Sequence, residues 1–305
     1  MAGAGVRDTL IDGPWQHHDL AANGIRFHLA LGESYRPARP LVVLLHGFGE
    51  FWWAWRHQIP ALDEAGFGVA ALDLRGYGAS DKTPRGYDPR TTAADVAGVI
   101  RSLGHRDAVV VGHDWGGMAA WATTAYAPQQ IRALAMIAAP HPLAFPWRSA
   151  GGQFAFHQLP LLPERRIMAD DGAYLERLLR ERSAPASGWP APAEARRYRD
   201  ALMLWPSPHC ALEYQRMFVR DQLRAGGRDY RRALRRGVDA PLLSVHGQLD
   251  RIVPVQAMTA AERYVRGRHD LVSLPGVGHQ PHEEAPAALT KALLRWLREL
   301  ESEPP

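Results

Sequence analysis

The sequence VVVGHDWGGMAAW, residues 109–121, passes from an apolar run through a glycine to an aspartate, and then through two more glycines into a second apolar run. This order predicts a buried strand that turns sharply into a helix, with Asp114 at the tip of the turn. A carboxylate inside a strand would be costly to bury, and an ordinary surface aspartate would not need glycines packed around it. The stretch therefore predicts an α/β fold in which this turn presents a functional carboxylate.

Other short apolar runs predict further buried strands, because they are too short for helices and most end at Gly, His or Asp. With the run before Asp114, they cover residues 41–45, 68–72, 108–111, 133–137, 242–245 and 271–274. Helical patterns lie between many of them. The clearest covers residues 92–103, with Thr92 as N-cap and Gly104 at its end. This alternation predicts a mostly parallel sheet flanked by helices.

The pattern changes between residues 142 and 236, where strand signals stop and proline becomes frequent. Amphipathic helical stretches, such as residues 211–223, take over there. We therefore expect an α/β core formed by residues 1–141 and 237–305, interrupted by a helical lid at 142–236.

Composition narrows the classes of function. No apolar run of the 305 residues approaches the roughly 18 that a membrane span needs, and the N-terminus lacks a signal-peptide pattern, so we expect a cytoplasmic protein without membrane contact. The single cysteine, Cys210, excludes a disulfide within the chain and a cysteine-based metal cluster. The net charge of +4 comes from arginines interspersed with acidic residues, which favours solvated helical faces over a nucleic-acid surface.

Reactive residues follow three of the predicted strands. Ligands of parallel α/β sheets bind beyond the carboxyl ends of the strands, so these residues should meet at one edge. Asp114 occupies the central position of a G-x-S-x-G nucleophile turn, with Asp in place of Ser. Asp250 and His279 follow the strands at 242–245 and 271–274. Together they form a nucleophile, a base and an acid that orients the base.

Each of these residues has a structural alternative. Asp114 could be an ordinary helix N-cap, Asp250 could cap a turn, and His282 competes with His279 as the base. The occurrence of all three groups at compatible strand ends favours the catalytic interpretation. The backbone N–H groups of Phe48 and Trp115 would then form the oxyanion hole.

An aspartate nucleophile restricts the reaction. Attack on an acyl group would give an anhydride, whereas attack on an sp³ carbon with a leaving group gives an alkyl ester. His279 can then activate water to hydrolyse that ester. The electrophile should therefore be an epoxide carbon or a carbon that bears a halide.

Five segments resemble the α/β-hydrolase fold epoxide hydrolases, in the same order and across nearly the whole core. They read HGFGEFWWAWRHQIPAL, DLRGYGASDKT, GHDWGGMAAW, HGQLDRIVP and GVGHQPHEEAP. The resemblance implies that Asp114, His279 and Asp250 are the nucleophile, base and acid, and that the lid closes the site. It also implies no cofactor and no metal, because the reaction needs only the epoxide and water. We expect an apolar epoxide, given the aromatic residues of the lid, and a monomer or homodimer.

The lid departs from the usual epoxide hydrolase pattern. The family usually has two lid tyrosines that protonate the epoxide oxygen, one of them directly before an arginine. Here Gln215 precedes Arg216, and Tyr214 stands one residue earlier. His157 falls near the place of the second tyrosine. We expect His157 or Tyr214 to donate the proton, since Gln215 can donate a hydrogen bond but not a proton.

Two alternatives remain open. Haloalkane and haloacid dehalogenases share the aspartate turn and can use a tryptophan after it to hold halide, as Trp115 would, although many have a polar residue where Phe48 stands. A halide needs no proton to leave, so the missing lid tyrosine favours this alternative. A non-catalytic binding protein on the same scaffold is less favoured, because no member of the triad is lost.

Overall fold

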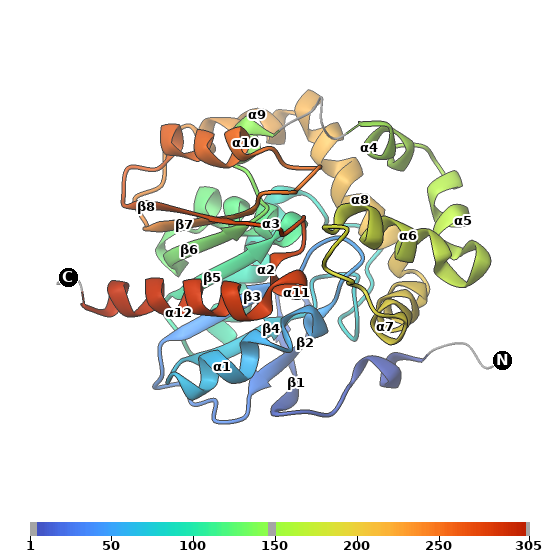
Figure 1. Ribbon diagram of the computed structural model, residues 1–305. Coiled ribbons are helices and arrows are strands. Elements are labelled where there is room, and N and C mark those ends of the chain that lie inside the picture. Colours follow the sequence, from blue (N-terminus) through green and yellow to red (C-terminus); the bar gives the residue numbers. More distant parts are fainter. Residues whose placement is uncertain (1–4, 146–150, 303–305) are drawn as a thin grey trace.

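The computed structural model describes residues 5–145 and 151–302 (Figure 1). Its eight-stranded sheet has the order β1-β2-β4-β3-β5-β6-β7-β8, and all neighbours from β4 onward are parallel. The strands are β1 Trp15–Ala22, β2 Ile25–Gly32, β3 Leu41–Leu45, β4 Gly68–Leu72, β5 Ala108–His113, β6 Ile131–Ile137, β7 Leu242–Gly247 and β8 His269–Leu274. Every residue of β3, β4 and β5 is buried, as expected for strands that are covered on both faces. The mostly parallel sheet predicted from the sequence is confirmed.

The strands β1 and β2 were missed in the sequence analysis. They form an antiparallel hairpin, and β2 also pairs antiparallel with β4. Most of β1 is exposed or half-buried and contains adjacent polar residues, so it lacks the continuous apolar run used to find the others. The available signal was the turn, since Asn23 and Gly24 have φ values of 46° and 78°. An Asn-Gly pair between two strands is a strong hairpin signal because both residues tolerate positive φ.

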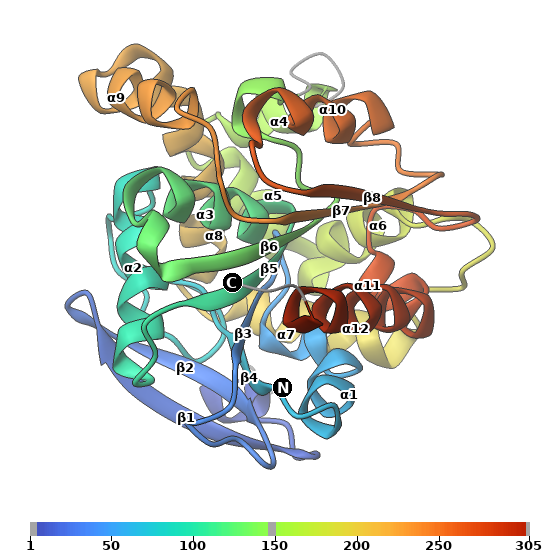
Figure 2. The same ribbon diagram turned by 90° about the vertical axis from the view of Figure 1, so that its left-hand side faces the viewer.

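Helices of the core cover the two faces of the sheet, with α2 and α3 on one and α1 and α12 on the other (Figure 2). The core helices are α1 Gln58–Glu64, α2 Pro89–Ser102, α3 Asp114–Tyr126, α10 Val255–Thr259, α11 Pro281–Glu284 and α12 Pro286–Ser302. The helix predicted to start at Thr92 begins three residues earlier. Asp88 is its N-cap, accepting from the Thr91 N–H at 3.1 Å, and Pro89 occupies the first turn.

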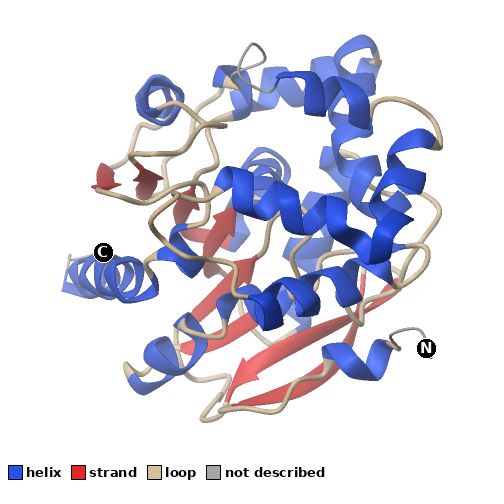
Figure 3. Cartoon of the chain, turned by 45° about the vertical axis from the view of Figure 1, so that its right-hand side comes forward, coloured by secondary structure: helices blue, strands red, loops and turns tan. Residues whose placement is uncertain are grey.

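In its described residues, 142–145 and 151–241, the chain between β6 and β7 contains helices, loops and one isolated β-bridge from Val238 to Val265. The helices are η4 Pro142–Ala144, α4 Gly151–His157, α5 Leu162–Met168, α6 Ala173–Arg182, α7 Pro192–Met203, α8 Ser207–Arg220 and α9 Ala225–Leu234. Figure 3 shows most of them grouped beside the sheet. The helix expected at residues 211–223 corresponds to α8, which starts at Ser207, and residues 221–223 form a separate 3-10 turn. Across all described residues, the helices are too short or too polar to span a bilayer.

The helical segment is joined to the core by buried polar contacts. Arg56, from the core, binds Glu283 in α11 at 2.5 Å and Glu194 in α7 at 2.6 Å. The Tyr198 hydroxyl in α7 also donates to Glu283. At the end of α6, the carbonyl of Arg182 accepts from the His279 N–H at 3.0 Å, and the Ala184 N–H donates to Glu284 at 2.7 Å. The loop that carries His279 is therefore held from both sides, by the core and by the lid.

Candidate active site

Asp114 lies in a strained turn between β5 and α3. Its φ is 46°, a left-handed conformation that is rare for residues other than glycine. The turn is close to the neighbouring strand, because a Cβ atom added at Gly116 would lie 2.3 Å from the Leu45 carbonyl oxygen. Backbone strain of this kind is typical of functional sites. The geometry is that of a nucleophile turn, which lifts the side chain above the end of the sheet.

The structure brings Asp114, His279 and Asp250 together. His279 Nδ1 donates to Asp250 Oδ2 at 2.8 Å, and Nε2 lies 3.8 Å from Asp114 Oδ1. The other oxygen of Asp250 accepts from the N–H groups of Ile252 at 2.7 Å and Val253 at 3.0 Å. Asp250 is thereby fixed in orientation, and it directs the second nitrogen of the imidazole toward Asp114.

For both Asp114 and His279, burial and the neighbouring charges shift the pKa in opposite directions, and the charges have the larger effect. Burial alone would raise the pKa of Asp114, but the adjacent His279, together with Arg182 and His113, lowers it to about 2. Burial would lower the pKa of His279, but the charges of Asp250 and Asp114 raise it to about 10. At neutral pH the free site therefore holds an ionised Asp114 beside a protonated His279.

Backbone amides lie where the sequence analysis expected an oxyanion hole. The Phe48 N–H donates to Asp114 Oδ2 at 3.1 Å. The Trp115 N–H belongs to the first turn of α3, where amides have no partner within the helix. One oxygen of Asp114 is thus held by an amide, and the other faces His279.

Glu50, His113 and His282 form a buried group behind the triad. Glu50 Oε2 accepts from the Gly47 N–H at 2.6 Å and from His113 Nδ1 at 3.0 Å. His113 Nε2 donates to the His279 carbonyl at 2.9 Å. The imidazole of His282 faces Glu50, 3.3 Å from Oε1. Candidate metal-ligand atoms of these three residues lie within 4.8 Å of one another, but their hydrogen bonds already tie the Gly47 loop to the His279 loop.

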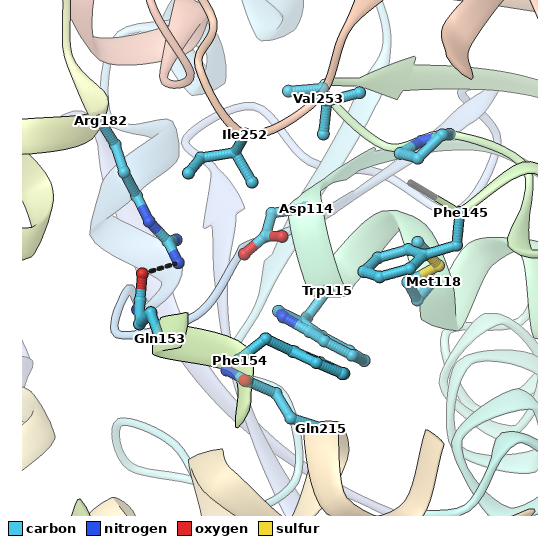
Figure 4. Close-up of a pocket in the computed structure, with 12 residues that line it drawn as sticks. Asp114, Trp115, Met118, Phe145, Gln153, Phe154, Arg182, Gln215, Ile252 and Val253 are labelled. Atoms are coloured by element: carbon cyan, nitrogen blue, oxygen red, sulfur yellow. Dashed lines mark hydrogen bonds between the residues drawn. The ribbon is translucent and has the colours of Figure 1, made fainter. Parts of the chain in front are cut away.

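A cavity opens above Asp114 (Figure 4). Its polar lining residues are Asp114, Gln153, Arg182 and Gln215. The remainder of its lining is apolar and consists of Trp115, Met118, Ala138, Pro140, Phe145, Phe154, Ile252 and Val253. The cavity therefore suits a largely apolar molecule that presents an electrophilic carbon to Asp114.

Of the three lid residues singled out in the sequence, Gln215 alone lines this cavity. His157 is fully buried behind it, and its Nδ1 donates to Gln215 Oε1 at 2.9 Å while Nε2 accepts from the Tyr174 hydroxyl at 2.8 Å. Because the carbonyl oxygen of Gln215 is used by His157, its NH₂ group is left for the cavity. Burial lowers the pKa of His157 to about 4, so its imidazole is neutral at pH 7.

Tyr214 lies outside the cavity. Its hydroxyl donates to the Arg75 carbonyl at 3.0 Å, and its ring packs against Tyr77 and Tyr87. The structure thus brings Gln215 to the site, places His157 one hydrogen bond away from the cavity lining, and leaves Tyr214 at the interface between α8 and the core.

Three residues near the site were missed in the sequence analysis: Gln153, Tyr174 and Arg182. Arg182 belongs to the sequence LERLLRERS, residues 175–183, where nothing distinguishes it from the surrounding arginines. Gln153 and Tyr174 lie in stretches without a motif. Their positions depend on how α4 and α6 pack, which no local pattern reveals.

Comparisons with known proteins agree with this fold. The family model described as alpha/beta hydrolase fold matches residues 40–286. The AB hydrolase superfamily protein YfhM of Bacillus subtilis is 31% identical over 295 residues, which is 90% of this chain and 96% of that protein. Epoxide hydrolase A of Mycobacterium tuberculosis is 29% identical, with 92% and 96% covered. The crystal structure of Epoxide Hydrolase A from Mycobacterium thermoresistibile superimposes with a TM-score of 0.80 at 25% identity, covering 93% of this chain and 98% of that one.

Proposed function

The chain belongs to the α/β-hydrolase fold family, which confirms the fold predicted from its sequence, and from this premise we propose that it hydrolyses epoxides to vicinal diols. The single observation that carries the proposal is the carboxylate of Asp114 at the nucleophile turn, 3.8 Å from His279 and bonded to the Phe48 N–H. The epoxide hydrolases among its relatives support the same activity.

In the first step Asp114 Oδ1 attacks one carbon of the epoxide, the C–O bond of the ring breaks, and an alkyl ester forms. The ring oxygen develops negative charge, and the NH₂ group of Gln215 donates a hydrogen bond to it. This oxygen also needs a proton. We propose that water supplies it, because His157 is neutral at pH 7 and bonded to the Gln215 oxygen, and the Tyr214 hydroxyl donates to Arg75. The hydroxide that remains takes the proton of His279, which leaves this histidine neutral for the second step.

In the second step His279 Nε2 takes a proton from water, and the hydroxide attacks the Asp114 carbonyl carbon. The oxyanion forms on Oδ2, which already accepts from the Phe48 N–H, and the Trp115 N–H is the second donor. Collapse of this intermediate expels the diol oxygen, which takes the proton of the added hydroxyl group, and Asp114 is regenerated as a carboxylate beside protonated His279. One of its carboxylate oxygens now comes from water, so a single turnover in H₂¹⁸O should label the enzyme before it labels the diol.

A haloalkane or haloacid dehalogenase is the second candidate, and one observation favours it. Neither ionisable lid residue predicted to supply a proton, His157 or Tyr214, borders the cavity. A halide leaves without a proton, and the Gln215 amide and Trp115 indole are suitable donors to it. The same kind of ester on Asp114 would form, and bromide or another halide would be released, whereas the oxygen of an opened epoxide stays attached to the alkyl group.

The deciding experiment uses styrene oxide and 1-bromobutane in separate incubations, with diol and bromide as the products measured. Asp114→Ala serves as the blank for both. Diol without bromide, abolished in the variant, is the expected result. Bromide without diol would indicate a dehalogenase. If neither product is formed, both proposals are wrong.

A further inference from the structure

Arg182 brings a positive charge to the cavity above Asp114. It is the last residue of α6, and its backbone carbonyl accepts from the His279 N–H at 3.0 Å. Its position relative to the triad is therefore fixed by the backbone, and its side chain borders the same cavity as Asp114 (Figure 4).

This guanidinium has no carboxylate partner among the described residues. Nη2 donates to the amide oxygen of Gln153 at 3.3 Å, and the buried Nε has no hydrogen-bond acceptor. The two buried arginines among the described residues are each paired with an acid at 2.6 Å, Arg75 with Asp95 and Arg216 with Glu164. A half-buried cation that keeps donors unused beside a cavity is available for an anion that enters it.

Arg182 and the apolar residues Phe145 and Met118 lie on opposite sides of Asp114. Figure 4 shows Gln153 on the same side as Arg182. A molecule whose reactive carbon lies at Asp114 would therefore place one substituent against the guanidinium and the opposite substituent among apolar side chains.

We propose that the substrate is an epoxide with a carboxylate on one ring carbon and an apolar group on the other, and that Arg182 binds the carboxylate. This rests on the proposed epoxide hydrolysis and names its substrate class. The guanidinium offers the planar pair of N–H donors that matches a carboxylate. Water adds across the ring as before, and the product is a 2,3-dihydroxy acid.

The test compares 3-phenyloxirane-2-carboxylate with β-methylstyrene oxide, in which a methyl group replaces the carboxylate. We expect the protein to hydrolyse the acid with a kcat/KM about 10- to 100-fold higher, the range of a hydrogen bond to a charged group. Arg182→Gln should abolish this preference, because the loss of kcat/KM on the acid should exceed any loss on the neutral epoxide by about 10-fold or more. Arg180→Gln removes the same charge from an exposed position of α6, paired with Glu176, and should keep the preference.

Two results would overturn the proposal while leaving epoxide hydrolysis intact. One is an equal kcat/KM for both epoxides in the unaltered protein. The other is an equal loss on both epoxides in Arg182→Gln, which would mean that Arg182 acts on Asp114 and not on the substrate.

A binding measurement separates failure of this proposal from failure of the proposed function. Calorimetric titration with 3-phenylpropanoate and with 3-phenylpropanamide needs no turnover. If neither epoxide is hydrolysed, tighter binding of the anion that is lost in Arg182→Gln supports an anion site without epoxide chemistry. Equal binding of the two compounds contradicts the site itself.

Discussion

In the free protein the imidazole of His279 lies between two carboxylates, Asp250 at 2.8 Å and Asp114 at 3.8 Å. Both carboxylates stabilise the protonated imidazole, so the pKa of His279 is raised to about 10. In the proposed mechanism, alkylation of Asp114 removes one of these two negative charges. The pKa of His279 should then fall, so we expect the histidine to become a base only after the ester has formed.

The pH dependence of the two steps should therefore differ. Asp114, with a pKa of about 2, stays ionised throughout the range above pH 4, so ester formation should lose no rate there from its protonation. Ester hydrolysis needs neutral His279 and should slow as the pH falls through the pKa of the ester form. Intact-mass measurement after rapid quenching should show more ester at pH 5.5 than at pH 8. Less ester at pH 5.5 would contradict this assignment of the base.

Replacing the base should trap the intermediate. His279→Gln keeps a polar side chain of similar reach but cannot take a proton from water. Ester formation should continue while its hydrolysis slows by about 100-fold or more, within the range of general base catalysis. Intact mass with styrene oxide should show one adduct, and peptide mapping should place it on Asp114. An adduct elsewhere, or none, argues against the covalent mechanism.

Gln215 gives a third test at the level of one side chain. Gln215→Met removes the NH₂ donor and keeps a similar volume, so ring opening of an epoxide should slow by about 10- to 100-fold. The matched variant Gln215→Glu supplies a proton when its carboxyl is protonated, and it should recover rate as the pH falls. Single-turnover ester formation measures both. An unchanged rate of ester formation in Gln215→Met would mean that Gln215 takes no part in ring opening.

The sheet shows which elements the sequence reveals. All six predicted strands were found. Burial on both faces requires the continuous apolar runs of β3 to β5, whereas the edge strand β8 is only partly buried and was found from its short apolar run. The hairpin β1–β2 was missed because the edge strand β1 is largely exposed, and because the polar residues Arg26 and His28 interrupt the apolar run of β2. The sequence also placed Asp114, Asp250 and His279 at strand ends, since parallel strands bring those ends together. Arg182 could not be found, because its place depends on the packing of α6 against the His279 loop.

The turn at Asp114 depends on the absence of a side chain at Gly116. A Cβ there would lie 2.3 Å from the Leu45 carbonyl and 2.5 Å from the His46 carbonyl, and both are backbone atoms that cannot rotate away. Gly116→Ala should cost about 3 kcal/mol of unfolding free energy, near the upper end for overpacking, and should lower activity by displacing Asp114. Urea unfolding and the diol assay check this. Gly226→Ala in α9, where a Cβ meets nothing within 4 Å, should cause neither loss.

At the scale of the whole molecule, lid and core share buried charges. Glu283 lies in the core with its side chain fully buried, and it is held by Arg56 and by Tyr198 of the lid. Arg56 itself also reaches Glu194 of the lid. These contacts cross from one part of the chain to the other, so the two parts should unfold together.

Removing Arg56 should therefore be costly for the entire protein. Arg56→Leu leaves Glu283 buried without its cation, and the unfolding free energy should fall by about 3–5 kcal/mol. Urea denaturation followed by tryptophan fluorescence measures the change. Arg266→Leu breaks an exposed pair with Asp239 and should leave the denaturation midpoint nearly unchanged. Equal effects of the two substitutions would contradict a shared, buried connection.

The contacts at the end of α6 set the boundary for any exchange of lids between relatives. Arg182 accepts the His279 N–H, Ala184 donates to Glu284, and the backbone of Gly278 is so close to Ala184 that a Cβ there would lie 2.6 Å from its nitrogen. Residues 182–184 therefore contact the loop that carries His279 as closely as they contact the helical segment. A chimera with the helical segment of a relative should keep these three residues, or should also take residues 278–284 from that relative. Otherwise two backbone segments from different proteins would have to fit together at this contact.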